Sequence, residues 1–255
     1  MKNTTLVMVP CFSGAPWNLS QMTELKDWPM KTMKLPDDLN YLEDLADFVT
    51  GEVRELDSYY LVGDSFGAAI SLALATRNPQ GLRGLIMSGG FAKNPVTSPV
   101  LKTLSFLAPY FPGVFYRELT LRVHAYNLRS KFDAEGQIPW SQGKTKQFFT
   151  EWTPHKAYVN RVRAAEKCDY VSKLNQIKVP TLILTPEEDR IIGPEAAQIM
   201  LKGIPNAVEQ VLPRTGHMFR FSNPALYSKY IKEFLTKLTK KYNELAELGK
   251  EDKFK

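Results

Sequence analysis

The sequence predicts an α/β protein with a doubly wound, mostly parallel sheet of about six strands. In residues 1–90 and 172–255, short apolar runs alternate with helix-like stretches, an alternation typical of parallel sheets covered by helices. Between them, residues 91–171 contain helix-like stretches and no convincing strand. We therefore expect the outer segments to form one core and residues 91–171 to form a helical cap inserted after the fourth strand.

Four strands are expected in the N-terminal segment, because each is a short apolar or β-branched run of the kind buried in parallel sheets. These runs are 5–9, 30–35, 59–62 and 82–87. Helices are expected between the strands, at 19–27, at 39–56 and at 66–76. The helix at 39–56 is indicated by leucines and valines at helical spacing, and the one at 66–76 by its small residues.

The middle segment contains helix-like stretches at 100–110, 114–129 and 154–174, separated by Pro and Gly. The alternation then resumes, with strands at 181–185 and 208–212 and helices at 193–202 and 223–248. An insertion after the fourth strand would lie over the carboxyl edge of the sheet, where open α/β sheets bind their ligands. The functional site is therefore expected between the middle segment and the core.

Composition excludes several classes of protein. The 255 residues are 44% hydrophobic and 24% charged, as in ordinary globular proteins. No apolar run approaches the roughly 18 residues of a membrane span, and the apolar stretch near the N-terminus is too short for a secretory signal. We therefore expect a cytoplasmic protein. Cys11, Cys168 and three histidines fit neither a disulfide framework nor a zinc motif, so no metal or other cofactor is expected.

The net charge of +6 is concentrated in the middle of the chain, because residues 91–170 hold 12 Lys and Arg against 6 Asp and Glu. A solvated surface would explain this excess, and so would the mouth of a site that attracts anionic substrates. Nucleic-acid binding is not expected, since the excess is modest and no recognised nucleic-acid-binding module is present. The oligomeric state is left open.

A Gly-x-Ser-x-Gly pattern carries the strongest chemical signal. Gly63, Ser65 and Gly67 lie between a predicted strand and a predicted helix. A sharp turn there would lift the serine hydroxyl clear of the sheet, and the two glycines leave room where side chains would collide. The same turn would aim the backbone N–H of Phe66 at a developing oxyanion. Ser65 is therefore the predicted nucleophile.

The base and acid that a nucleophilic serine needs are expected later in the chain. His217 follows the last predicted strand and precedes the final helix, whereas His124 and His155 lie in the middle segment, where packing or surface roles are more common. Three consecutive acids end at Asp189, directly after the strand at 181–185. Asp189 is the predicted partner that would hold the imidazole of His217 in its working tautomer.

The segments 63–67, 186–189 with Ile192, and 216–217 resemble the three catalytic segments of the α/β-hydrolase superfamily, in the family's order Ser, Asp, His. The resemblance covers nearly the whole chain, is strongest to small serine carboxylesterases with a helical cap, and implies a fold, a triad and an oxyanion hole. This chain has Pro10-Cys11 where the family usually has His-Gly. By position, Phe12 would supply the second oxyanion N–H.

Residues 91–170 hold 14 of the 29 aromatic residues. Most are expected to pack between cap and core, while Phe106, Phe111, Trp140 and Trp152 are candidates to line an apolar pocket. The leading hypothesis is hydrolysis of small-molecule esters with an apolar acyl group, through an acyl-enzyme on Ser65. The alternatives are carrier-linked ester or thioester hydrolysis aided by Arg122, Arg161 or Arg163, carbon–carbon hydrolysis or lysis by the same triad, and ligand binding without catalysis.

Overall fold

The computed structural model describes residues 4–95, 99–107 and 110–251. A six-stranded sheet has the order β2-β1-β3-β4-β5-β6, and each neighbouring pair is parallel. Its strands are β1 (Thr5–Val9), β2 (Met30–Thr32), β3 (Tyr59–Asp64), β4 (Leu82–Ser88), β5 (Thr181–Pro186) and β6 (Ala207–Leu212). The predicted parallel sheet of about six strands is therefore confirmed, with a shorter second strand than expected.

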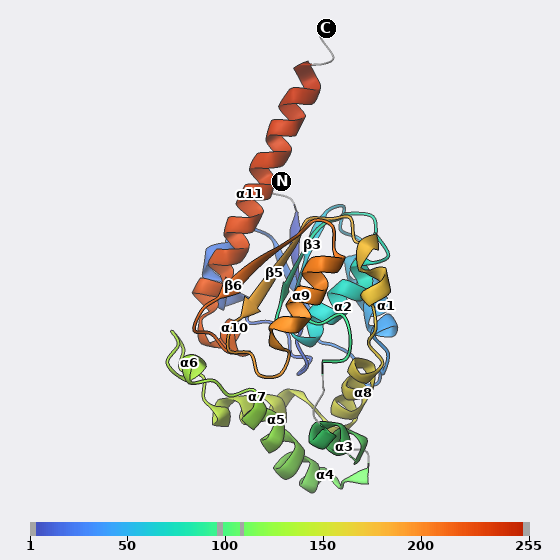
Figure 1. The fold of residues 1–255 in the computed structure, drawn as a ribbon, viewed down its shortest axis with the longest axis vertical. Coiled ribbons are helices and arrows are strands. Elements are labelled where there is room, and N and C mark those ends of the chain that lie inside the picture. Colours follow the sequence, from blue (N-terminus) through green and yellow to red (C-terminus); the bar gives the residue numbers. More distant parts are fainter. Residues whose placement is uncertain (1–3, 96–98, 108–109, 252–255) are drawn as a thin grey trace.

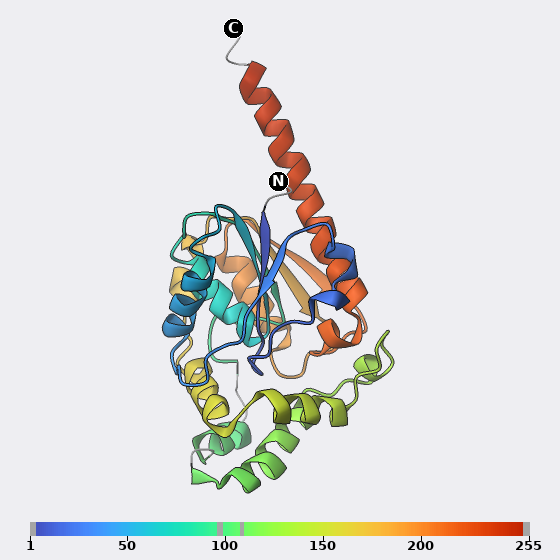
Figure 2. The same ribbon diagram turned by 180° about the vertical axis from the view of Figure 1, so that it is seen from behind.

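Both faces of the sheet are covered (Figures 1 and 2). In β1, Val7 and Val9 belong to one buried cluster while Leu6 and Met8 belong to the other, as the two-residue period of a strand requires. The first cluster lies under α1 (Leu42–Val53), α2 (Phe66–Ala75) and α9 (Gly193–Gly203). The second lies under the short α10 (Phe219–Ser222) and the long α11 (Pro224–Glu251).

The α-helix expected at 19–27 is wrong. The chain forms two 3₁₀ turns there, η1 (Leu19–Gln21) and η2 (Thr23–Leu25). Met22 and Leu25 are buried in the second cluster, and Leu19 packs against it. A spacing of three residues matches the three residues per turn of a 3₁₀ helix, so this geometry directs all three side chains into the core.

Helices fill the segment between β4 and β5. They are α3 (Pro99–Leu107), α4 (Gly113–Phe115), the π-helical turn η4 (Tyr116–Thr120), α5 (Leu121–Asn127), α6 (Lys131–Ala134), α7 (Gln142–Trp152), α8 (His155–Glu166) and, nearest β5, the 3₁₀ helix η5 (Val171–Gln176). The stretch expected at 114–129 is thus divided into three elements, and α6 and α7 were not expected. Both ribbon views place α3 to α8 beyond the carboxyl ends of the strands.

The two ends of this helical segment lie side by side. Lys93 and Asp169 form an antiparallel bridge. Asn94 N donates to Cys168 O at 2.9 Å, and Tyr170 N donates to Ala92 O at 2.7 Å. This short pairing holds the exit from the core and the return to it together. The division into a core (1–90 and 172–255) and a cap (91–171) stays a prediction.

The strand order determines where a site can form. After β1 the chain moves to one side to form β2 and then to the other side to form β3. The loops that follow β1 and β3 therefore diverge and leave a crevice at the carboxyl edge. Ser65 begins one of these loops, and Phe12 lies in the other. Among the described residues, no helix has the length and apolar character that crossing a membrane requires.

Candidate active site

Ser65 lies at the turn between β3 and α2 with φ of 55° and ψ of −117°. A residue with a side chain adopts such angles only where its surroundings impose them. A Cβ on Gly63 would lie 2.6 Å from Ala68 N, and one on Gly67 would overlap the carbonyl oxygens of Pro10 and Val9. Both positions therefore require glycine, because the colliding atoms are backbone atoms that cannot rotate away.

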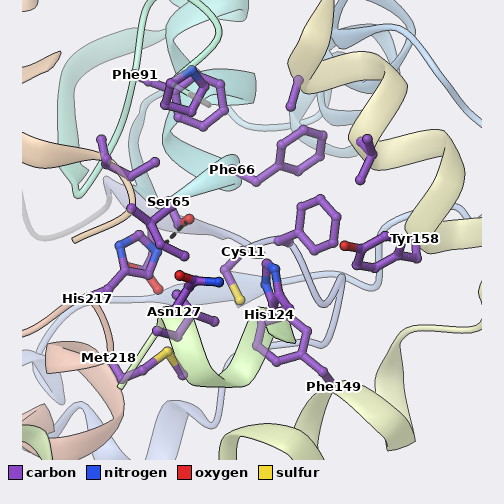
Figure 3. Close-up of a pocket in the computed structure, with 18 of the residues that line it drawn as sticks. Cys11, Ser65, Phe66, Phe91, His124, Asn127, Phe149, Tyr158, His217 and Met218 are labelled. Carbon is purple, nitrogen blue, oxygen red and sulfur yellow. Dashed lines mark hydrogen bonds between the residues drawn. The ribbon is translucent and has the colours of Figure 1, made fainter. Parts of the chain in front are cut away.

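Ser65, His217 and Asp189 form a continuous hydrogen-bonded relay. The Ser65 hydroxyl donates to Nε2 of His217 over 2.8 Å, drawn as a dashed line in Figure 3. Nδ1–H of His217 donates to Oδ2 of Asp189 over 2.6 Å. Asp189 follows β5 and His217 follows β6. The three residues predicted from the sequence thus meet at one edge of the sheet, in an arrangement that can turn a hydroxyl into a nucleophile.

Asp189 is held in its ionised form. Its Oδ1 accepts from the backbone N–H groups of Ile191 at 2.9 Å and Ile192 at 3.0 Å. Burial by itself would raise the pKa of this carboxyl, but His217 and the two N–H donors outweigh it and leave the pKa below its usual value. An ionised Asp189 fixes the imidazole tautomer with the proton on Nδ1, so Nε2 is free to accept from Ser65.

His217 has a pKa above its ordinary value of 6.5. Burial lowers this pKa, but the negative charge of Asp189 and its hydrogen bond to the imidazole outweigh the effect of burial. The charges of Asp64 and Asp133 also raise the pKa. Asp133 also holds the histidine loop in place, because its carboxylate accepts from Met218 N at 3.3 Å and from Ser222 Oγ at 2.8 Å. A residue of α6 therefore supports the loop that carries His217.

Two backbone N–H groups are available beside Ser65. Phe66 is the first residue of α2, and Phe12 lies in the loop after β1, where Gly14 N closes a turn onto Cys11 O at 2.9 Å. The Phe12 and Phe66 rings pack edge to face with their centroids 5.7 Å apart. Within the described residues, neither backbone N–H donates to a protein acceptor. These two donors remain the candidates for an oxyanion hole.

A mostly apolar cavity opens next to Ser65 (Figure 3). Its volume is about 120 Å³, roughly the volume that four molecules of liquid water occupy. The walls come from the core and the helical segment, and include Phe12, Phe66, Phe91, Val123, Leu128, Phe149, Tyr158, Val162, Ile191, Ile192, Met218 and Phe221. The cavity could therefore hold a medium-sized apolar group within reach of the serine.

The four aromatic residues expected in the pocket do not line this cavity. Phe106 on α3 is 70% exposed. Trp140 packs on Phe221 with ring centroids 4.7 Å apart. Phe111 and Trp152 are half-buried outside the cavity. The density of aromatic residues indicates that the segment contributes to an apolar pocket, but it does not reveal which side of each helix faces the core.

Sequence reasoning missed several residues that the cavity brings together. His124 and Asn127 of α5 line it, although His124 was assigned to the surface or to packing. Cys11 also lines it and is a free thiol, as is Cys168. A sequence signal existed on α5, because Leu121, Ala125 and Leu128 are buried and a polar residue within the same helical stripe stands out against them.

Two buried arginines lie behind the cavity wall. Arg220 donates to Asp64 Oδ2 at 2.8 Å, so the ion-pair partner of Asp64 is Arg220 and not His217. Arg161 of α8 is fully buried and donates to Phe12 O, Ser13 O and Asp37 Oδ1. Neither guanidinium is free for a substrate. In the part of the chain that the structure describes, no three His, Cys, Asp or Glu side chains gather as a metal site would require.

A family model described as serine aminopeptidase, S33, matches residues 29–220. Two curated relatives are 24% identical to this chain. The 2-hydroxy-6-oxononadienedioate/2-hydroxy-6-oxononatrienedioate hydrolase of Cupriavidus pinatubonensis aligns over 72% of this chain and 65% of its own length. The 2-hydroxymuconate semialdehyde hydrolase of Pseudomonas sp. strain CF600 aligns over 78% and 71%. The alignment thus spans about two thirds of the length of these relatives.

A solved structure supports the fold independently. The thermophilic esterase of Thermogutta terrifontis, with malate bound, superimposes with a TM-score of 0.75 over 92% of this chain and 89% of its own, at 20% identity. The resemblance seen in the sequence is therefore confirmed at the level of superfamily and fold. Since the family model matches most of the chain, this protein belongs to the serine aminopeptidase S33 family, within the α/β-hydrolase superfamily.

Proposed function

We propose that this protein hydrolyses carboxylic esters of small molecules with an apolar acyl group. One observation carries the proposal. The relay of Ser65, His217 and Asp189 ends at the wall of an apolar cavity, so that an acyl chain in the cavity would bring its carbonyl carbon next to the Ser65 hydroxyl. An apolar pocket with a few convergent polar groups is the usual form of a small-molecule site.

The proposed reaction has two halves. Ser65 Oγ forms a bond to the carbonyl carbon while His217 Nε2 takes the hydroxyl proton, and the N–H groups of Phe12 and Phe66 bind the oxyanion. The tetrahedral intermediate collapses by breaking the bond to the alcohol oxygen, which leaves with the proton from His217. Water, deprotonated by His217, then attacks the acyl-enzyme, and the acid is released as Ser65 recovers its proton.

Carbon–carbon hydrolysis is the second candidate, because the two relatives are named as hydrolases of 2-hydroxymuconate semialdehyde and of a dioate. A dioate carries two carboxylates, which need cationic partners when they enter an apolar pocket. Among the described residues that line the cavity, Lys102 is the one Lys or Arg, and it is exposed. The lack of a buried cation facing the cavity favours a neutral ester.

Carrier-linked substrates receive less support than the basic segment suggested. Arg161 is buried against backbone carbonyls, so it cannot meet an anionic carrier. Arg122 is exposed but pairs with Glu118 at 3.1 Å, and Arg163 is exposed. A salt-sensitive reaction that is lost in Arg163→Ala would restore the carrier hypothesis, because exposed charge attraction weakens as ionic strength rises.

The test is a series of p-nitrophenyl esters from acetate to palmitate, assayed with the native protein, Ser65→Ala and Ser20→Ala. Ser20 is exposed and far in sequence from the relay, so its variant controls for loss of a serine. We expect a maximum between butyrate and octanoate, as the cavity volume suggests, and no turnover with Ser65→Ala. Turnover that survives in Ser65→Ala, or faster cleavage of 2-hydroxymuconate semialdehyde than of every ester, would contradict the proposal.

A further inference from the structure

Among the polar side chains that line the cavity and that the proposed reaction does not use, two lie on one helix. His124 and Asn127 both belong to α5 and both line the cavity (Figure 3). Residues three apart on a helix lie on the same face with their Cβ atoms about 5–6 Å apart, so the two polar groups can bind one atom together. They face walls that are otherwise mostly aromatic and aliphatic.

The ring of His124 is held in position by packing alone. It lies 5.3 Å from the ring of Phe12, 4.8 Å from that of Phe149 and 6.0 Å from that of Tyr158, measured between centroids. Among the described residues, none forms a hydrogen bond with its ring nitrogens, and these nitrogens are not fully buried. The ring is thus oriented without being bonded, and both nitrogens are available to a ligand.

His124 is neutral near pH 7. Burial, together with the positive charge of a protonated His217, lowers its pKa to about 4. A neutral imidazole presents one N–H donor and one nitrogen acceptor. It cannot neutralise a carboxylate, and a second cation beside His217 would in any case oppose the protonation that His217 undergoes during the reaction.

Asn127 supplies a further acceptor. Its Nδ2 donates to Val123 O at 2.9 Å, one turn back along α5. This bond fixes the side-chain amide and leaves Oδ1 without a hydrogen bond among the described residues. Oδ1 can therefore accept a hydrogen bond from a ligand in the cavity, and the imidazole of His124 can donate one to the same ligand.

From this juxtaposition we infer that His124 and Asn127 form a binding site for an uncharged hydroxyl group of the substrate, in addition to the ester group cleaved at Ser65. A hydroxyl both donates and accepts, so its hydrogen can bond to Asn127 Oδ1 while its oxygen accepts from the His124 N–H. A ketone oxygen could not donate to Asn127 Oδ1, and a carboxylate would meet no positive charge on these two side chains. The inference rests on the proposed ester hydrolysis and narrows it to hydroxylated acyl or alcohol groups.

The test compares p-nitrophenyl hexanoate with p-nitrophenyl hexanoates that carry one hydroxyl at the third or at the terminal carbon. We expect at least one hydroxylated ester to show kcat/KM about fivefold to twenty-fivefold above the plain ester, the effect of one to two ordinary hydrogen bonds. The preference should disappear in His124→Phe, which keeps an aromatic ring in the stack, and in Asn127→Leu. Tyr126→Phe is the matched control, because Tyr126 lies on the exposed side of α5.

The outcomes separate this inference from the proposed function. Equal rates on plain and hydroxylated esters, or a preference that persists unchanged in His124→Phe and Asn127→Leu, would overturn the hydroxyl site while ester hydrolysis stands. If the native protein turned over none of the esters, the proposed function itself would be contradicted. A second readout needs no turnover. It compares how well hexane-1,6-diol and hexan-1-ol each protect Ser65 from labelling by a fluorophosphonate.

Discussion

Arg161 offers a sharp test of how the helical segment stabilises the loop after β1. Its side chain is fully buried and donates to Phe12 O at 3.1 Å, to Ser13 O at 2.7 Å and to Asp37 Oδ1 at 2.9 Å. Burial lowers the pKa of this arginine, and the charge of Asp37 opposes that effect. Arg161→Ala would leave a carboxylate and four carbonyl oxygens, those of Phe12, Ser13, Leu35 and Pro36, without this donor.

The size of the effect follows from these contacts. Breaking a buried ion pair by removing one partner costs about 3–5 kcal/mol. The lower end applies, because the Asp37 side chain is 32% exposed and Nε of Arg161 has no partner in the described part of the structure. We therefore expect Arg161→Ala to lower the free energy of unfolding by about 3 kcal/mol, and the melting temperature by about 6–12 °C for a chain of this size.

Urea unfolding followed by circular dichroism measures this change. Arg163→Ala is the matched control, since Arg163 lies two residues along α8 and is exposed, and its change should stay within about 0.5 kcal/mol. Arg161→Lys should recover only part of the loss, because an ammonium cannot bond to the same spread of acceptors as a guanidinium. A decrease in the free energy of unfolding below about 1 kcal/mol for Arg161→Ala would contradict the expectation that this side chain stabilises the loop after β1.

Three further predictions concern the site. Because the pKa of His217 is raised above 6.5, the neutral imidazole that acts as the base is lost as pH falls through that raised pKa. The acid limb of kcat/KM should therefore have its midpoint above pH 6.5, and a midpoint below pH 6.5 would contradict this prediction. Gly67→Ala should abolish ester turnover, because its Cβ would overlap backbone atoms. Gly51→Ala should instead add about 0.5–1 kcal/mol to the free energy of unfolding, since a Cβ there meets nothing within 4 Å; a melting temperature for Gly51→Ala below that for Gly67→Ala would contradict this comparison. Asp64→Asn should lower the free energy of unfolding, measured in urea, by about 3 kcal/mol, because Arg220 would lose its buried charge partner. It should also shift the acid limb of kcat/KM to lower pH, because the charge of Asp64 raises the pKa of His217. Unchanged stability and an unchanged acid limb would contradict this prediction.

The sequence was most informative where a local pattern determines the structure. The strand at 5–9 was predictable because residues on both faces are apolar, and the structure buries them on both faces. The glycines around Ser65 were predictable because the turn forbids a Cβ there. In both places the constraint lies within a few residues, so the sequence displays it directly.

Contacts between distant segments were not predictable in the same way. Trp140 was expected in the pocket, but it packs on Phe221 and donates its indole N–H to Thr145 Oγ1 at 2.9 Å. Phe149 lines the cavity instead. Helical periodicity indicates that one side of a helix is apolar, but the partner of that side depends on how the helical segment packs on the core. The placement of His124 beside the relay has the same non-local origin.

We propose that Ser65 is the nucleophile and that His217 activates it. Labelling of the intact protein with a fluorophosphonate, followed by mass spectrometry of its peptides, measures this directly. We expect one phosphonyl adduct on Ser65, none in Ser65→Ala, and labelling slowed by orders of magnitude in His217→Ala. A folded protein that takes no label, or one labelled at another residue such as Cys11, would contradict it.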